Sequence, residues 1–292
     1  NTFRIVLIYY KRAMVYEKTL CYGTLNPDLI YFIEDLPEAG GDIRSNNYNI
    51  RAGGTAINCA ENIANWGISV SVLGNSIGKD ALGEYLLSEL REKNILHEEI
   101  ILTDNPTPTC SIFVDRDGER TIVSSGYSNC SWNTLSEIKN FQSLLVDRYS
   151  IPNIKNSITE IKKSGVFVVQ AGYEYPIDYE IDFLVVSKDE IDVIEAENLL
   201  NNELVSRILL THSNLPARLI SSEGAIEITP PDFKTINATG AGDVTAAYIA
   251  ANGVEDIIST IKNACAAGAI LAGTGELPTL EKIAEISELV DV

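Results

Sequence analysis

Short apolar runs in the second half of the chain alternate with amphipathic stretches. The runs cover residues 166–170, 183–186 and 208–210, and residues 69–73 form a further strand candidate. Such runs are typical of parallel strands that are buried on both faces. Helical patterns lie between or after them, at 80–93, 154–163, 189–200, 243–251 and 256–272. This alternation predicts an α/β fold, a doubly wound and mostly parallel sheet with helices on both faces.

Two regions break the alternation. Residues 25–50 and residues 110–125 each combine strand-like segments with turn sequences, and neither region contains a helical pattern. We expect them to form a small antiparallel β-sheet lid, inserted from about 25–52 and 108–127. Parallel-sheet enzymes bind ligands beyond the carboxyl ends of their strands, so a lid there would cover a site.

No linker or repeat divides the chain, so we expect one α/β domain over residues 14–292. Met14 is the only methionine, and residues 1–13 are expected to lie upstream of the natural start. The apolar segment 3–10 precedes Lys11 and Arg12, whereas a secretory signal carries its positive charge first. No uninterrupted apolar run approaches the roughly 18 residues that span a bilayer.

The charge balance restricts the ligands. The chain has 41 acidic and 22 basic residues and a formal net charge of −19. Such a surface repels phosphate backbones, so we expect neither nucleic acid nor a membrane as a partner. An anionic ligand must therefore be held locally, by backbone N–H groups or through a metal ion.

The cysteines and histidines exclude other chemistry. The five cysteines form no CxxC pair and indicate reduced thiols in a cytoplasmic protein. The only two histidines, His97 and His212, are far apart and lack metal-ligand spacing. A zinc site or a Ser-His-Asp triad is therefore not expected.

Residues 237–243, Asn-Ala-Thr-Gly-Ala-Gly-Asp, carry the sharpest chemical signal. They precede a helical apolar pattern, and the two glycines allow the backbone to pass close to a ligand. A helix N-terminus adds unpaired N–H donors and about half a positive charge, which makes an anion hole without Lys or Arg. Asp243 would lie at its mouth, kept ionised by the helix dipole and placed to take a hydroxyl proton. The alternative is a plain turn with Asp243 as the helix cap.

Residues 51–58 carry the second signal. Thr55 is a suitable N-cap for a helix that Gly67 can end, and Asn58 falls in its first turn. The amide of Asn58 could bond sugar hydroxyls. The alternative is an asparagine that is solvated or caps the helix.

Together these segments resemble the paired signatures of the ribokinase-like (PfkB) carbohydrate kinases. The first signature is matched by residues 53–58 with 74–80 and Gly83, and the second by residues 237–243. Intermediate landmarks fit in order: Gly23-x-x-Asn26-x-Asp28, residues 106–109 and residues 117–120. The resemblance runs from about Tyr22 to the C-terminus and implies the same fold, a doubly wound domain with a β lid.

The resemblance also implies roles for individual residues. The phosphoryl acceptor would contact Asn26, Asp28, Gly53, Gly54 and Asn58. The anion hole would be Gly240, Ala241 and Gly242, with Asp243 as the catalytic base. The nucleotide would lie at Ser187, Thr211, Ser213 and Asn263, and Glu190 would reach the metal through water. The implied cofactors are ATP and Mg²⁺.

The donor side departs from the family pattern. The family's Asn-x-x-Glu appears as residues 187–190 with Ser187 in place of the asparagine, and its Thr-x-Gly-x-x-Gly appears as residues 211–216 without glycines. The leading Asp of the second signature is Asn237. We therefore expect weak dependence on potassium, which many relatives hold partly through that Asp.

The sequence favours an ATP-dependent kinase that phosphorylates a hydroxyl of a sugar or nucleoside. The acceptor could be ribose, a keto-sugar acid, a sugar phosphate, inositol or a nucleoside. The alternative is a non-catalytic family member that binds a sugar or nucleotide. Lid sheets in this family often pair between subunits, so a homodimer through the lid is expected.

Overall fold

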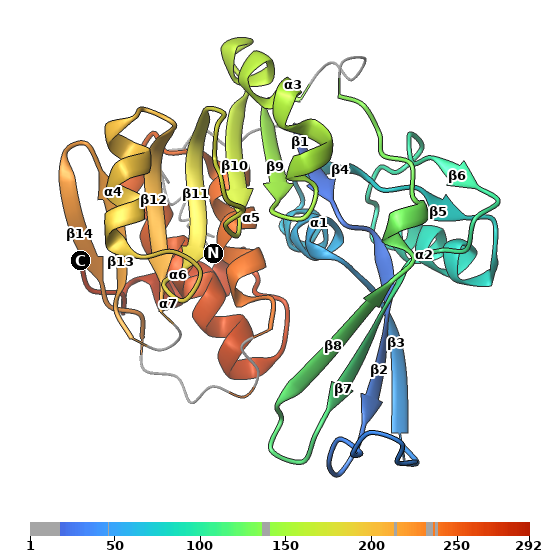
Figure 1. Ribbon diagram of the computed structural model, residues 1–292. Helices are drawn as coiled ribbons and strands as arrows, with labels where there is room; N and C mark the ends of the chain where they lie inside the picture. The colour runs from blue at the N-terminus through green and yellow to red at the C-terminus, as the bar shows by residue number, and fades with distance from the viewer. Residues whose placement is uncertain (1–17, 46, 136–140, 213–214, 232–235, 237–238) are drawn as a thin grey trace, which may run out of the picture.

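A computed structural model describes residues 18–292 except 46, 136–140, 213–214, 232–235 and 237–238. Within that part, strands and helices alternate along most of the chain (Figure 1). The strands are β1 Lys18–Gly23, β2 Asn26–Phe32, β3 Asn47–Gly53, β4 Ser69–Gly74, β5 Ile77–Gly78, β6 Leu102–Thr103, β7 Thr109–Val114, β8 Arg120–Ser125, β9 Ser143–Asp147, β10 Phe167–Ala171, β11 Ile181–Ser187, β12 Val205–Thr211, β13 Ala217–Ser221 and β14 Gly224–Ile228. The helices are α1 Thr55–Asn65, α2 Ala81–Glu92, α3 Ile151–Lys163, α4 Val193–Asn201, α5 Ala241–Asn252, α6 Ile257–Thr274 and α7 Leu280–Ser287, with a short 3-10 helix at Tyr127–Asn129.

The main sheet has eight strands in the order β14-β13-β12-β11-β10-β9-β1-β4. Within this order the strands β12, β11, β10, β9, β1 and β4 are parallel to one another. Strands β13 and β14 add an antiparallel edge. The predicted strands are β4, β10, β11 and β12, so the prediction of a mostly parallel sheet is confirmed. The chain leaves β1 toward β4 and then returns to β9 on the other side of β1. This reversal places a topological switch point between β1 and β9.

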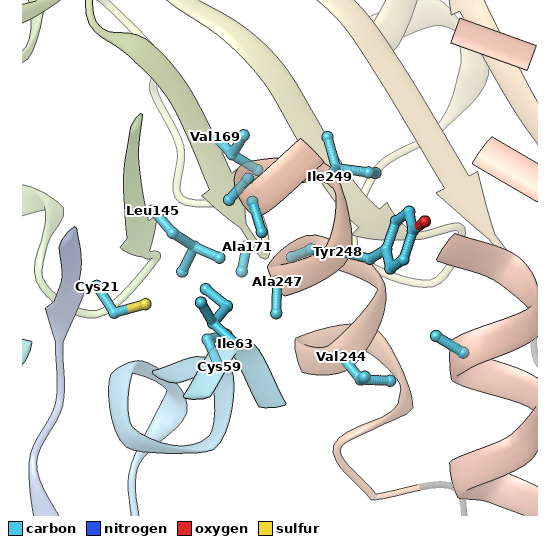
Figure 2. Packing of buried hydrophobic residues seen from close by; sticks show 14 of the residues in the cluster. Cys21, Cys59, Ile63, Leu145, Val169, Ala171, Val244, Ala247, Tyr248 and Ile249 are labelled. Atoms are coloured by element: carbon cyan, nitrogen blue, oxygen red, sulfur yellow. The ribbon is translucent and has the colours of Figure 1, made fainter. Parts of the chain in front are cut away.

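Helices cover both faces of the main sheet, as predicted (Figure 1). Alternate strand residues point to opposite faces. Cys21, Leu145 and Val169 therefore lie in one apolar cluster with α1, α5, α6 and α7, and their neighbours Leu144 and Val168 in another with α3 and α4. Figure 2 shows the first cluster, where Cys59 and Ile63 of α1 and Ala247 of α5 meet sheet residues such as Ala171 of β10.

Helix α6 alone, among the described helices, is long and apolar enough to cross a membrane by length and composition. It packs against α5 and α7, and its buried side chains belong to the same cluster as those of the sheet. A buried helix in a protein core has this composition, so α6 gives only weak support for a membrane span.

A second sheet of four strands projects from the main one, in the order β3-β2-β7-β8 (Figure 1). The blue strands β2 and β3 and the green strands β7 and β8 are far apart in sequence but lie side by side. Both hairpins are antiparallel, as predicted, while the central pair β2–β7 is parallel. The pairing is parallel because the chain enters β2 and β7 from the same end, next to the main sheet.

Two predicted helix starts are wrong. Thr55 is the first residue of α1 rather than its cap, and Gly54 holds the cap position at φ 89°. A side chain at Gly54 would place its Cβ 2.1 Å from the Thr24 carbonyl oxygen, so only glycine fits there. Helix α4 starts at Val193 rather than at 189, because the Asp192 side chain accepts the Glu195 N–H and caps the helix there.

Candidate functional site

Several of the predicted site residues that the structure describes lie at the carboxyl edge of the main sheet, around the switch point. Strand β1 ends there at Gly23 and β9 at Asp147, and their neighbours β10, β11 and β12 end along the same edge. The N-termini of α1 and α5 point to this edge, since Asn58 near the start of α1 bonds Asp243 near the start of α5. Elements that are distant in sequence thus converge where open α/β sheets bind ligands.

Asp243 lies in the first turn of α5 and is not its cap, because Gly240 occupies the cap position. Its Oδ2 accepts a hydrogen bond of 2.9 Å from the Asn58 side-chain amide. Burial raises the pKa of Asp243 to about 6; the Asn58 hydrogen bond opposes this rise and the charge of Asp147 adds to it. A pKa of about 6 leaves the carboxylate mostly ionised at neutral pH and close to the value suited to a general base.

The predicted anion hole is the first turn of α5. Gly240 has a φ of 81°, a left-handed conformation that directs the chain into the helix without a side-chain penalty. The first N–H groups of a helix have no acceptor within it. Gly242 is exposed, and a Cβ built on it would meet no atom within 4 Å. The turn therefore offers N–H donors beside open space.

Four predicted acceptor residues lie together where the second sheet joins the main one. The Asn26 amide donates to Asp28 Oδ1 at 2.9 Å, and both side chains are buried. Gly53 lies opposite Asn26 in the β2–β3 pair, and Gly54 follows it. A Cβ on Gly53 would be 2.3 Å from Asp28 Cγ, so glycine is required for the close packing of these strands.

Sequence reasoning missed two partners of these acceptor residues. Arg51 binds Asp28 Oδ2 through Nε at 3.1 Å and Nη2 at 3.0 Å. The Tyr127 hydroxyl donates to Asn26 Oδ1 at 2.6 Å. The register of an antiparallel pair places Arg51 opposite Asp28, a signal that only a correct strand alignment could supply.

A cavity of about 210 Å³ lies between α5 and the ends of the strands. Its wall includes Gly242 and Asp243 of α5 and Thr55 of α1, and on the opposite side residues at the ends of the strands: Arg148, Tyr149, Ala171, Gly172, Val185, Val186, Glu190 and Thr211. The structure thus brings the predicted base, part of the anion hole and two predicted donor-side residues to one cavity.

The remaining predicted donor-side residues within the described part of the chain do not line this cavity. The Ser187 N–H donates to Glu190 Oε2 at 3.0 Å, so residues 187–190 form a tight turn beside the cavity. Asn263 of α6 lies within bonding distance of Ser259, at 3.5 Å, and is not among the cavity's lining residues. Ser213 and Asn237 lie outside the described residues.

Asp147 is a second buried carboxylate that sequence reasoning missed. It accepts hydrogen bonds from the N–H and hydroxyl of Thr24, at 2.7 and 2.8 Å, and from the Ser150 N–H at 2.7 Å. The Thr24 hydroxyl oxygen in turn accepts the Thr55 N–H at the start of α1. Burial raises the pKa of Asp147, although these hydrogen bonds oppose the rise. The only sequence signal was an Asp at the end of an apolar run.

The site fits a metal only together with a ligand that supplies oxygens. In the described part of the chain no group of three or more His, Cys, Asp or Glu side chains could hold a metal ion. Glu190 is the one donor-side carboxylate on the cavity wall, and both its oxygens already have partners, Arg148 and the Ser187 N–H. Mg²⁺ usually keeps several waters and binds one or two carboxylates plus phosphates, so Glu190 could reach it through water.

Comparisons with known proteins identify the family of the chain. Residues 17–164 and 171–279 match the family described as "pfkB family carbohydrate kinase". Ribokinase of Lactococcus lactis subsp. lactis is 26% identical over 249 residues, which cover 77% of this chain and 80% of that protein.

Solved structures share the fold. The nucleoside kinase of Methanocaldococcus jannaschii, an archaeal member of the ribokinase family, superposes with a TM-score of 0.78 at 21% identity over 94% of this chain and 99% of that one. Arabidopsis thaliana ribokinase complexed with ribose and ATP gives 0.77 at 19% identity, with the same coverage. The family match covers most of the chain and both signature segments. The chain therefore belongs to the pfkB family of carbohydrate kinases, an enzyme family whose membership implies ATP-dependent phosphorylation of a sugar.

Proposed function

We propose that this kinase transfers the terminal phosphoryl group of ATP to a hydroxyl of a sugar or nucleoside, with Asp243 as the catalytic base. One observation carries the proposal: Asp243 shares a cavity wall with Gly242 of the anion hole and has a pKa raised to about 6. A carboxylate beside a helix N-terminus can accept a proton where the same turn stabilises a phosphoryl group.

The transfer follows from these positions. Asp243 takes the proton of the acceptor hydroxyl, the hydroxyl oxygen bonds to the terminal phosphorus, and the bond to the leaving ADP oxygen breaks. The N–H groups at Gly240, Ala241 and Gly242 stabilise the negative charge on the transferring group. When bound, Mg²⁺ offsets the charge of the phosphates, with Glu190 as its water-mediated ligand. Asp243 then releases its proton to solvent.

We assign the acceptor to the region where the second sheet joins the main sheet. Asn26, Asp28 and Asn58 would bond its hydroxyls, and Gly53 and Gly54 would let it approach the backbone. Asp28 faces Arg51, so the subsite offers a carboxylate and a guanidinium side by side. This pair is compatible with a neutral sugar or an acidic one.

The nucleotide is assigned to the ends of β11 and β12. Thr211 lines the cavity and Ser187 begins the turn that holds Glu190. Ser213 and Asn263 complete the proposed set, with Asn263 nearest the adenine. The altered turn at 187–190 and the glycine-free segment that begins at Thr211 mean that the donor contacts differ from the usual family pattern.

A non-catalytic binding role is the second candidate. It is favoured by the Arg148–Glu190 ion pair, which occupies the carboxylate expected to organise the metal. The intact Asn58–Asp243 pair favours catalysis instead, because it keeps a carboxylate on the cavity wall beside the first turn of α5.

A panel of sugars, sugar acids, sugar phosphates and nucleosides, tested for ADP release with ATP and Mg²⁺, separates the two candidates. We expect at least one acceptor to release ADP in proportion to the phosphorylated product. ATP binding measured by calorimetry, without turnover on any acceptor, would establish the non-catalytic role.

The wider assignments rest on the arrangement of the chain. We assign residues 14–292 to one kinase domain and the second sheet to a lid that closes over the acceptor and excludes water.

All five cysteines are unpaired, which supports a cytoplasmic location. Exposed apolar residues on the lid, Phe32, Tyr48, Ile122 and Val123, support a homodimer through it. Sedimentation as a monomer of 31.9 kDa would contradict that assembly.

A further inference from the structure

Arg148 is the first residue after β9, and its backbone fixes it at the carboxyl edge of the sheet. Its N–H donates to the Ala171 carbonyl at 3.0 Å, between the ends of β9 and β10. The side chain is one-third exposed and forms part of the cavity wall, on which Asp243 also lies. A cation therefore shares the cavity with the proposed base and anion hole.

The guanidinium is held in place by several neighbours. Nη1 forms an ion pair with Glu190, and Nη2 donates to the Tyr149 hydroxyl at 2.8 Å. The guanidinium carbon also lies 4.8 Å from the centre of the Tyr149 ring. Gly172 leaves space for the aliphatic part, since a Cβ there would be 2.9 Å from Arg148 Cδ. An arginine held in this way loses little side-chain entropy when it binds a ligand.

The chemistry of this group fits phosphate. A guanidinium has five N–H donors in a planar fork that matches phosphate oxygens, and the two contacts to Glu190 and Tyr149 use only two of them. In a chain with a net charge of −19, Arg148 is the only lysine or arginine on the cavity wall among the residues that the structure describes. Because Ser187 replaces the family asparagine nearby, the donor side also lacks one of its usual polar groups.

We propose that Arg148 binds phosphate oxygens of the nucleotide in this cavity, and that Glu190 is its counter-ion before the nucleotide arrives. The inference rests on the proposed function for the identity of the ligand, a nucleoside di- or triphosphate. Arg148 adds positive charge opposite the anion hole, so that phosphate is held from both sides. Glu190 competes with phosphate for the guanidinium, and the two residues have opposite effects on affinity when no metal is present.

The test is calorimetric binding of ADP and of adenosine to the full chain in EDTA, for the wild type, Arg148→Gln, Arg148→Lys and Glu190→Gln. Arg148→Gln should weaken ADP binding roughly 10- to 100-fold and change adenosine binding less than about two-fold, since adenosine carries no phosphate. Arg148→Lys keeps the charge but loses the fork, and should fall between. Glu190→Gln should tighten ADP binding by about two- to five-fold, because the competing carboxylate is gone.

Lys162→Gln is the matched control. It removes a cation from an ion pair of similar exposure, Lys162 with Asp182, which is absent from the cavity wall. The control should leave the affinities for both ligands unchanged.

Three results would overturn the inference. Equal losses of ADP and adenosine affinity in Arg148→Gln would show a structural role, and unchanged ADP affinity would show no role at all. Weaker or unchanged ADP binding by Glu190→Gln in EDTA would show that Glu190 does not compete with phosphate for Arg148. The direction of this change tests the inference even if Arg148→Gln is poorly folded. If the wild type binds ADP but releases none from ATP with any acceptor, the proposed function fails while the Arg148 inference stands or falls on its own data.

Discussion

The two walls of the cavity are built in different ways. The α5 wall comes from one short segment, whose Gly242 and Asp243 line the cavity, and the distant hydrogen-bond partners of Asp243, Asn58 and Cys59, both lie on α1. The opposite wall is assembled from the ends of β9, β10 and β11, where Arg148 and Glu190 meet across 42 positions of sequence. The first wall is encoded by a short motif, whereas the second depends on the register of the whole sheet.

The walls also treat their carboxylates differently. Asp243 is half-buried, has an amide partner and has a pKa raised to about 6, whereas Glu190 is paired with a guanidinium. Desolvation raises the pKa of Asp243 toward the range suited to a general base, whereas Glu190 is engaged by the Arg148 guanidinium. This contrast supports the proposed division, with proton transfer at the first wall and phosphate binding at the second.

The largest expected effect is on the first wall. Asp243→Asn should cut turnover roughly 10²- to 10⁴-fold, because the proton acceptor is lost while the shape is kept. ATP and acceptor affinities should stay within about two-fold of wild type by calorimetry. Turnover within a few-fold of wild type would remove Asp243 as the base and with it the difference between the walls.

The same variant carries a stability effect with a definite sign. The pKa of Asp243 is higher in the folded chain than its usual 3.8, so its stabilising effect is present at low pH and is lost as pH rises through about 6. Asp243→Asn should therefore melt higher than wild type at pH 8, by about 2 to 4 °C, and this difference should shrink below pH 5.

The next effect concerns Asn58, which connects α1 to the first wall. Turnover of the wild type should fall below pH 6 as Asp243 takes a proton. Asn58→Ala removes a hydrogen bond that lowers the pKa of Asp243, so this acid limb should move to higher pH. Acceptor binding should also weaken, by about 1–3 kcal/mol if a buried hydrogen bond goes unmade.

A pH–rate profile of kcat and an acceptor titration check both parts. If the acid limb of the profile does not move, Asn58 does not lower the pKa of Asp243. Unchanged acceptor affinity would restrict Asn58 to contacts within the protein.

The sequence predicted the first wall well and the second poorly. Residues 240–243 and the helix that follows are local, so glycine positions and apolar periodicity were enough to predict a helix N-terminus with a carboxylate in its first turn. The strands β4, β10, β11 and β12 were equally visible, because buried parallel strands have continuous apolar runs.

The rest required long-range geometry. Strand β9 ends in Asp147 and Arg148, and nothing in its neighbourhood says that Arg148 will meet Glu190 or that Asp147 will bond Thr24. Pairing of β2 with β7 likewise decides which residues of the lid face one another. The raised pKa of Asp243 likewise comes mainly from burial and partly from Asp147, which is distant in sequence, so the local motif alone does not show it.

The smallest expected effect concerns Asn237, which precedes the proposed anion hole in sequence. Many relatives hold a potassium ion beside the anion hole, partly through an Asp at this position. A carboxylate attracts the ion by its full charge and an amide oxygen only by its dipole, so affinity should fall here. We expect less than about two-fold activation by potassium, and stronger activation in Asn237→Asp. Potassium chloride titrated against a large-cation chloride at constant ionic strength measures the difference. Saturable activation of the wild type at low millimolar potassium would show that the first wall keeps its ion without the carboxylate.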